Sequence, residues 1–124
     1  MKAFLIDPFK RTVGEVDYSG DFEDIYLAID CDTFTCVQAS ERGDTLYVDD
    51  EGLINGKEQA FFGWMGYPQP LAGKALLLGT DMNGESVATT LTLDEVNESV
   101  VWLSLINMNG QNMFVCTNAN ETEH

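Results

Sequence analysis

Consecutive carboxylates are the residues of this sequence whose type and spacing come nearest to a chemical site. Asp49, Asp50 and Glu51 follow one another, and alternation along a strand would put Asp49 and Glu51 on one side. Two carboxylates there could hold Mg²⁺ or Ca²⁺ weakly, but such a site needs further oxygen ligands that the spacing does not show. We therefore favour an acidic turn in which Gly52 takes a positive φ, and we expect no metal site.

The sequence offers no suitably placed base for nucleophilic catalysis. The one histidine, His124, is the last residue, so no set of nucleophile, histidine and acid can be assembled. The step Gly73-Lys74-Ala75 lacks the upstream spacing and the hydroxyl of a phosphate-binding loop. The cysteines Cys31, Cys36 and Cys116 form no Cys-x-x-Cys pair, and we expect buried structural thiols. The sequence thus predicts a protein that is not an enzyme and has no cofactor.

Acidity is the strongest signal of the composition. Twenty-one Asp and Glu face six Lys and Arg, which gives a net charge of −15, and residues 12–41 and 75–124 contain no Lys or Arg. Such a field repels nucleic acid and anionic membranes and speeds encounter with basic surfaces. The simple interpretation is solubility; the sharper one is that carboxylates spaced like phosphates occupy a DNA-binding cleft. The carboxylates that we expect to bind a partner are Glu15, Asp17, Asp21, Glu23, Asp24, Asp49, Asp50 and Glu51.

The segment 61–74 is the second candidate surface, because it combines four aromatic rings with two prolines and three glycines. Two interpretations stay open. In the first, the rings form a lid over the core. In the second, they form a rigid recognition platform for a nucleotide signal. The residues of that alternative ligand site are Trp64, Tyr67, Lys57 and Lys74.

One domain must position these residues, since 124 residues are the length of a single domain. We expect an α+β domain over 1–116 and a polar C-terminal tail over 117–124. Alternating or apolar runs bounded by turn residues predict the strands, which we place at 3–6, 11–18, 33–39, 45–48, 74–78, 86–91 and 113–116. Residues 57–67 are expected to form a loop or a short helical turn.

Two helices complete the expected fold. The first covers 21–29, with Asp21 as its cap and apolar residues on one face. The second starts at Thr92, where Thr-x-x-Glu matches a capping box. Its end is left open because 100–103 could equally be a strand, and the secondary structure of 100–116 stays undecided. The expected architecture is a mostly antiparallel sheet with the two helices packed on one face.

The sequence shows neither a transmembrane run nor a signal peptide. No apolar stretch approaches 18 residues, and the N-terminus lacks a cleavage pattern, so we expect the protein in the cytoplasm of a bacterial host cell.

Three stretches of the sequence resemble a known family. They are 31–37 (CDTFTCV), 43–53 (GDTLYVDDEGL) and 71–79 (LAGKALLLG). Together they are similar to DUF3846, a family of small domains found in bacteriophages and mobile elements, with no assigned activity. The resemblance covers about residues 25–80 and implies a fold and a genomic setting rather than a chemistry. Many members have a Pro-x-Asn…Ala-Thr element where this sequence has 55–62 (NGKEQAFF), so the role of that element is not carried over.

Charge and resemblance together lead to one expectation. The protein is a non-enzymatic acidic binding protein of phage or mobile-element origin that counters a host defence protein by occluding its basic, nucleic-acid-binding surface. It would bind neither nucleic acid nor membrane directly, and the sequence leaves its oligomeric state open. Two alternatives remain: a sponge for a nucleotide signal that uses the aromatic segment, or an accessory or oligomerisation module with no ligand.

Overall fold

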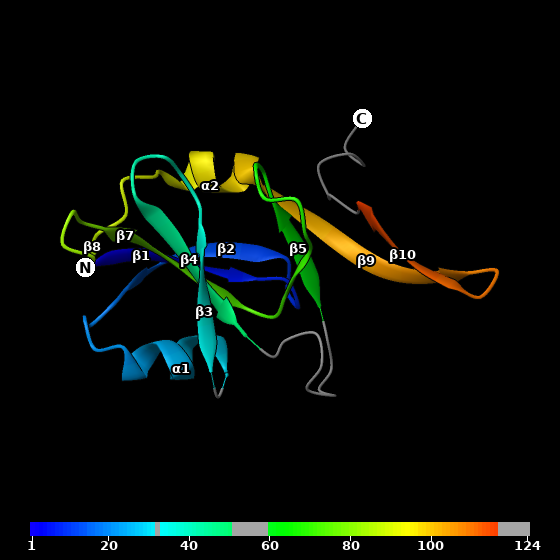
Figure 1. The fold of residues 1–124 in the computed structure, drawn as a ribbon, viewed down its shortest axis with the longest axis horizontal. Helices are drawn as coiled ribbons and strands as arrows, with labels where there is room; N and C mark the ends of the chain where they lie inside the picture. The colour runs from blue at the N-terminus through cyan, green and yellow to red at the C-terminus, as the bar shows by residue number, and fades with distance from the viewer. Residues whose placement is uncertain (32, 51–59, 117–124) are drawn as a thin grey trace.

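The computed structural model describes residues 1–31, 33–50 and 60–116, and it confirms the expected α+β class with antiparallel pairing. Figure 1 shows the fold. The elements, in chain order, are β1 (Lys2–Asp7), β2 (Thr12–Asp17), α1 (Glu23–Ile29), β3 (Phe34–Gln38), β4 (Asp44–Asp49), β5 (Phe61–Trp64), β6 (Leu71–Ala72), β7 (Ala75–Thr80), β8 (Ser86–Val87), α2 (Leu93–Ser99), β9 (Val100–Met108) and β10 (Gln111–Cys116).

Two antiparallel sheets replace the single sheet expected from the sequence. Sheet A has the strand order β2-β1-β7-β4-β3, and β8 pairs with the end of β7. Sheet B has the order β10-β9-β5-β6. The apolar run of β7 is buried along five of its six residues, as expected for a central strand that other layers cover.

The two helices lie on different faces of sheet A, which corrects the expectation that both pack on one face. Ile25 and Ile29 of α1 belong to a cluster with Leu76 and Leu78 of β7. Val96 of α2 belongs to the larger cluster, which fills the space between sheets A and B. Because side chains alternate along β7, this strand supplies both clusters, and the layers run from α1 through sheet A to sheet B and α2 (Figure 1).

Local sequence explains where the helices begin and end. The capping box of α2 is confirmed, because the Thr92 hydroxyl accepts from the Glu95 N–H and the Glu95 carboxylate accepts from the Thr92 N–H. This helix ends at Ser99, since Val100 already has extended backbone angles. Phe22 occupies the N-cap position of α1, and Asp21 acts one residue earlier by accepting from the Glu23 N–H.

The β9–β10 hairpin projects from the body of the molecule, as Figure 1 shows. Residues 100–103 of β9 pair with β5 inside sheet B, whereas 104–108 pair with β10 alone. Asn109 and Gly110 have positive φ values of 54° and 82°, as expected for an Asn-Gly hairpin turn. We call residues 104–116 the arm. The question left open for 100–116 is thus resolved as two strands.

Candidate functional site

The register of sheet A brings several turns with carboxylates to one end. Asp17 at the end of β2 lies opposite Lys2 at the start of β1, and Asp44 at the start of β4 lies opposite Gly79 near the end of β7. Three further segments are next to these positions in the chain and therefore lie at the same end. They are the start of α1, the β3–β4 turn and the β7–β8 turn. Its carboxylates, which we call the acidic end, are Asp17, Asp21, Glu23, Asp24, Glu41, Asp81 and Glu85.

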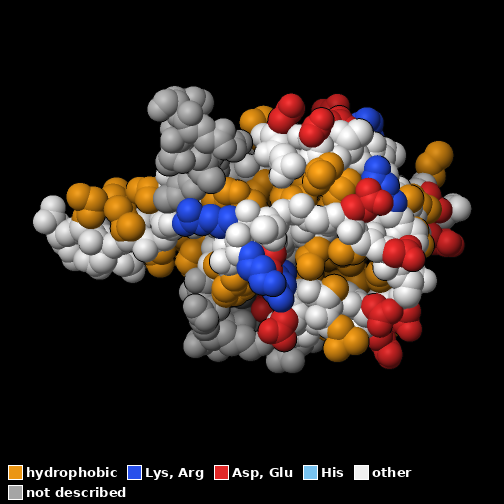
Figure 2. Space-filling model, turned by 180° about the vertical axis from the view of Figure 1, so that it is seen from behind, with side chains coloured by type: hydrophobic (Ala, Val, Ile, Leu, Met, Phe, Trp, Pro, Cys, Tyr) orange, Lys and Arg blue, Asp and Glu red, His pale blue; other side chains and the backbone are white. Residues whose placement is uncertain are grey.

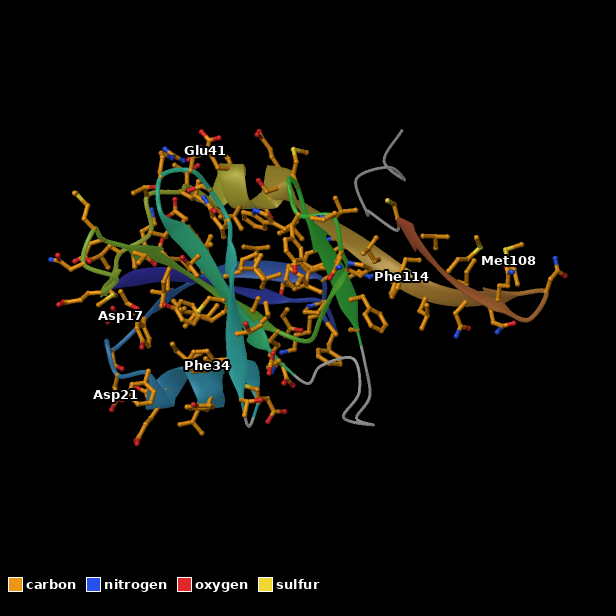
Figure 3. All side chains as sticks on the ribbon, in the orientation of Figure 1. Asp17, Asp21, Phe34, Glu41, Met108 and Phe114 are labelled. Carbon is orange, nitrogen blue, oxygen red and sulfur yellow. The ribbon has the colours of Figure 1, made fainter. Side chains whose placement is uncertain are left out.

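Hydrogen bonds within the acidic end hold its backbone in place. Ser19 donates to the Asp24 carboxylate at 2.5 Å and accepts from the Asp21 N–H at 3.1 Å. In the β7–β8 turn, the Asp81 carboxylate accepts from the N–H groups of Asn83 and Glu85, both at 2.9 Å. Figure 3 shows Asp17 and Asp21 near each other and Glu41 on the far side of the same end. The carboxylates therefore sit on ordered turns.

Few cations oppose these carboxylates. Among the residues that the structure describes, the cations at this end are the terminal amine, Lys2 and Arg42. The amine lies 2.8 Å from Asp17, and Arg42 lies 3.2 Å from Glu95 of α2. Both are thus paired, and within the described part of the chain Lys2 is the one further cation at this end.

The pKa values of two side chains in this region reflect the burial and the charges around them. The pKa of Asp17 is lowered, first by its hydrogen bond with the terminal amine and then by the charge of that amine. The pKa of Tyr18 is raised, mainly because burial disfavours the phenolate, and further by Tyr47, Asp21 and Asp24. The acidic end thus extends its negative potential to a buried side chain beside it.

The sequence-predicted carboxylates fall in different places. Asp17, Asp21, Glu23 and Asp24 belong to the acidic end, and Glu15 lies two residues before Asp17 on the same face of β2.

Asp49 and Asp50 lie at the other end of β4, about 17 Å away along the strand, and Glu51 lies outside the described residues. Asp49 and Asp50 are there accompanied by Lys10, Arg11 and Lys74, which precede or follow strands at that end. The eight predicted carboxylates therefore do not form one surface.

Sequence reasoning missed Glu41, Asp81 and Glu85. Each lies in a turn that could be recognised, but only the order of strands in sheet A places those turns beside Asp17. Figure 2, which shows the molecule from behind, shows most of its acidic side chains away from the arm, while Lys and Arg lie both near the arm and among the acidic side chains.

One acidic residue is structural. Asp44 is 1% exposed, and its carboxylate accepts from Ser40, Thr89 and the side chain and backbone of Thr90 at 2.6–2.9 Å. Burial acts to raise the pKa of Asp44, but these hydrogen bonds outweigh it and hold the pKa below its usual value. Asp44 thus joins the β3–β4 turn to the segment before α2 and offers nothing to a partner.

The aromatic segment is mostly core, in agreement with the lid interpretation. Phe61, Phe62 and Trp64 lie in β5, where we expected a loop or helical turn, and all three are buried. Trp64 is 4% exposed, and its indole N–H donates to the Ala39 carbonyl at 2.9 Å. Tyr67 is partly buried and packs against the same cluster.

The described residues of the alternative nucleotide site, Trp64, Tyr67 and Lys74, do not line one common hollow. Two shallow hollows flank Tyr67, with volumes of about 260 and 300 Å³. Lys74 is not among the described residues that line either hollow, and Lys57 lies outside the described residues. Trp64 lines the smaller hollow, but core packing occupies most of its ring.

The cysteines and carboxylates of the described residues form no metal-binding group of three or more. The expectation of buried thiols holds for Cys31, whereas Cys36 and Cys116 are exposed on β3 and β10. Neither α1 nor α2 has the length and apolar content that crossing a bilayer requires.

These features define a class: a small acidic α+β domain with two antiparallel sheets and an uncharged arm. Residues 1–100 match the family described as Domain of unknown function (DUF3846), and the chain belongs to that family. The match ends where β9 begins, so the arm lies beyond it. No curated protein and no solved structure matches the chain.

Proposed function

We propose that this protein is a non-enzymatic binding protein whose acidic end occludes a basic surface of another protein. The observation that supports this function best is the gathering of seven carboxylates at one end of sheet A, while Lys10, Arg11 and Lys74 lie at the other end. This polarity orients the molecule as it approaches a basic surface.

The charge density of the acidic end favours a nucleic-acid-binding surface as the target. Sheet A has five strands across this end, which span about 19 Å at a strand spacing of about 4.8 Å. Duplex DNA carries about 11 charges over that length, at one per 1.7 Å. Seven carboxylates against three cations, the terminal amine, Lys2 and Arg42, leave a net charge of about −4, which is somewhat more than a third of the DNA charge over that length. The carboxylates can therefore compete for the same Lys and Arg side chains.

The biological setting that we propose follows the family resemblance. A bacteriophage or mobile element benefits from a small acidic protein that inhibits a host defence protein. The inhibited defence protein is one that must bind nucleic acid. The partner is then a host protein, and the carboxylates of the acidic end take the place of phosphates. A nucleotide sponge has weaker support, because Trp64 is a core residue.

Two double variants that remove the same charge test the proposal. Asp21→Asn with Asp24→Asn removes two of the seven negative charges of the acidic end and keeps an oxygen acceptor for the Glu23 N–H and for Ser19. Asp49→Asn with Asp50→Asn removes two negative charges from the opposite end. Each immobilised protein is used to capture proteins from a bacterial host lysate in 0.1 M and 0.5 M salt, and the captured proteins are challenged with duplex DNA.

We expect the wild type to capture a nucleic-acid-binding protein that duplex DNA displaces, and that high salt releases. The Asp21/Asp24 variant should capture about tenfold less, a loss that corresponds to about 1.4 kcal/mol, and the Asp49/Asp50 variant should capture as much as the wild type. Capture that withstands both salt and DNA, or that both variants retain equally, would refute the proposed function.

A further inference from the structure

The arm carries no charged side chain, in a chain with a net charge of −15. Its exposed large apolar side chains are Leu105, Met108, Met113 and Phe114, with exposed fractions of 43%, 54%, 45% and 39%. Figure 3 labels Met108 and Phe114 on the arm, and Figure 2 shows apolar side chains along its length. Several exposed large apolar side chains on one short hairpin are typical of contact with another molecule.

Both faces of the arm carry apolar side chains beside polar ones. The register pairs Leu105 with Phe114 on one face and Ile106 with Met113 on the other. Strands that face water on one side alternate apolar and polar residues, whereas near-continuous apolar runs are typical of strands buried on both faces. A hairpin of two strands is also marginally stable on its own. Within the described residues, Phe61 covers part of this surface, with its ring 4.9 Å from that of Phe114.

Among the residues that the structure describes, β10 is an edge strand of sheet B. In an antiparallel pair, alternate residues turn their N–H and C=O groups away from the neighbouring strand, so half of β10 directs these groups to the free edge. Proteins protect such edges with charged residues, proline or bulges. The sequence of β10, QNMFVC, contains neither charge nor proline, and its register with β9 is unbroken. The edge strand β2 of sheet A, in contrast, carries Glu15 and Asp17.

We propose that the arm is a homodimerisation element, in which β10 of one copy pairs antiparallel with β10 of a second copy and joins the two sheets B into one. The lack of charge on the arm favours a second copy of this chain over a basic partner. A basic partner would find no carboxylate on the arm and would leave its own cations desolvated and unpaired, whereas a second arm is equally uncharged.

The length of the arm also removes the main obstacle to dimerisation, which is repulsion between two acidic bodies. The part of β9 that belongs to the arm, residues 104–108, is about 17 Å long, about twice the Debye length of about 8 Å at physiological salt. With the arms paired, the acidic ends lie at the distal sides of the dimer, where salt screens them from each other.

Two-fold symmetry restricts the register of the pairing. An axis normal to the sheet keeps each face on its own side, so even-numbered residues of β10 face even-numbered residues of the second copy. Centring on Phe114 sets Phe114 against Phe114 and Met113 against Val115, which matches aromatic with aromatic and apolar with apolar. The same register sets Asn112 against Cys116. Centring on Met113 would set Asn112 against Phe114, a poorer match.

Analytical ultracentrifugation of the full chain over a wide concentration range tests the proposal. Met113→Lys puts a charge on the arm, and Met82→Lys makes the same change at an exposed methionine of the β7–β8 turn. We expect the wild type to form a dimer, Met113→Lys to raise its dissociation constant about tenfold or more, and Met82→Lys to leave it unchanged. A wild type that stays monomeric, or a Met113→Lys dimer as tight as the wild type, overturns the proposal.

Cysteine cross-linking tests the register. Asn112→Cys should form a disulfide with the native Cys116 of the second copy, because directly opposed residues bring their Cβ atoms within reach. Asn107→Cys is the matched control, since Asn107 bonds to Asn112 at 3.0 Å but lies on β9, away from the free edge. Asn112→Cys that cross-links no faster than Asn107→Cys overturns the pairing.

Salt distinguishes this proposal from the proposed function. Added salt should leave the dimer unchanged or tighten it, because it screens the repulsion between acidic bodies. The same salt should weaken binding of a basic partner to the acidic end. A dimer that dissociates as salt rises contradicts pairing through the uncharged arm, whatever the acidic end binds.

Discussion

Asp44→Ala should strongly destabilise the fold, although Asp44 is one of 21 acidic residues in a chain with excess negative charge. The carboxylate is 1% exposed and accepts four hydrogen bonds from Ser40, Thr89 and Thr90. Hydrogen bonds to a charged group are each worth about 1.5–3 kcal/mol, but they are not additive, and the hydroxyls of Ser40 and Thr90 can turn to water. We expect Asp44→Ala to lower the free energy of unfolding by about 3–4 kcal/mol.

Asp44→Asn removes the charge of this side chain and keeps its size and shape. The amide can keep one acceptor oxygen for Thr89 and the Thr90 N–H, while the hydroxyls that bonded the other oxygen must reverse. The expected loss is about 1–2 kcal/mol. Urea unfolding followed by the fluorescence of buried Trp64 measures both variants. Asp30→Asn is the control, since Asp30 is exposed with φ 55°, a conformation that Asn adopts readily, and it should change stability by less than about 0.5 kcal/mol.

The stability that Asp44 contributes depends on pH in a defined direction. Because the folded-state pKa of Asp44 is lowered, the contribution is fully present above the unfolded pKa of about 3.9 and is lost as the pH falls through the folded value. The difference in unfolding free energy between wild type and Asp44→Asn should therefore shrink below about pH 4. An Asp44→Ala variant within about 1 kcal/mol of the wild type at pH 7 would show that these hydrogen bonds are not stabilising, and would refute the reasoning.

Three further substitutions test local features by urea unfolding. Thr92→Ala removes the capping box of α2 and should cost about 1 kcal/mol, whereas Thr92→Ser should restore most of it. Gly79→Ala should cost about 2 kcal/mol or more, because the new Cβ would lie 2.5 Å from the Ala88 carbonyl oxygen, and a gain in stability would show that the β7–β8 connection yields. Trp64→Phe removes a buried indole hydrogen bond and packed volume and should cost about 2–4 kcal/mol; a smaller loss would indicate a segment that contributes little to the core.

Local signals in the sequence predicted the elements that depend on local physics. The Thr92 capping box, the Asn109-Gly110 turn and the strands around Gly43 all follow from side-chain or backbone properties of adjacent residues. The second sheet could not be predicted in this way. β5 is four residues long and lies next to a segment rich in proline and glycine, and its partner β9 is about 40 residues further along the chain. A pairing that distant leaves no signature in a window of the sequence.

The sequence predicted some carboxylates of the acidic end, but not the full set. Asp21, Glu23 and Asp24 are adjacent in sequence, so their proximity follows from the chain itself. Asp17 and Asp49 lie at opposite ends of sheet A because β2 and β4 run in opposite directions, which only the strand order reveals. The burial of Asp44 likewise depends on Thr89, 45 residues away.

The central place of β7 in sheet A has a consequence for synthesis of the protein. β7 pairs with β1, β4 and β8, and Leu77 lies opposite both Phe4 and Leu46. At about 5–20 residues per second, a ribosome needs about 4–15 seconds to reach position 77. During that interval the first two hairpins have no strand between them to unite them. A nascent chain whose synthesis stops before β7 therefore has two separate hairpins with exposed apolar side chains. Chaperones and proteases recognise such surfaces.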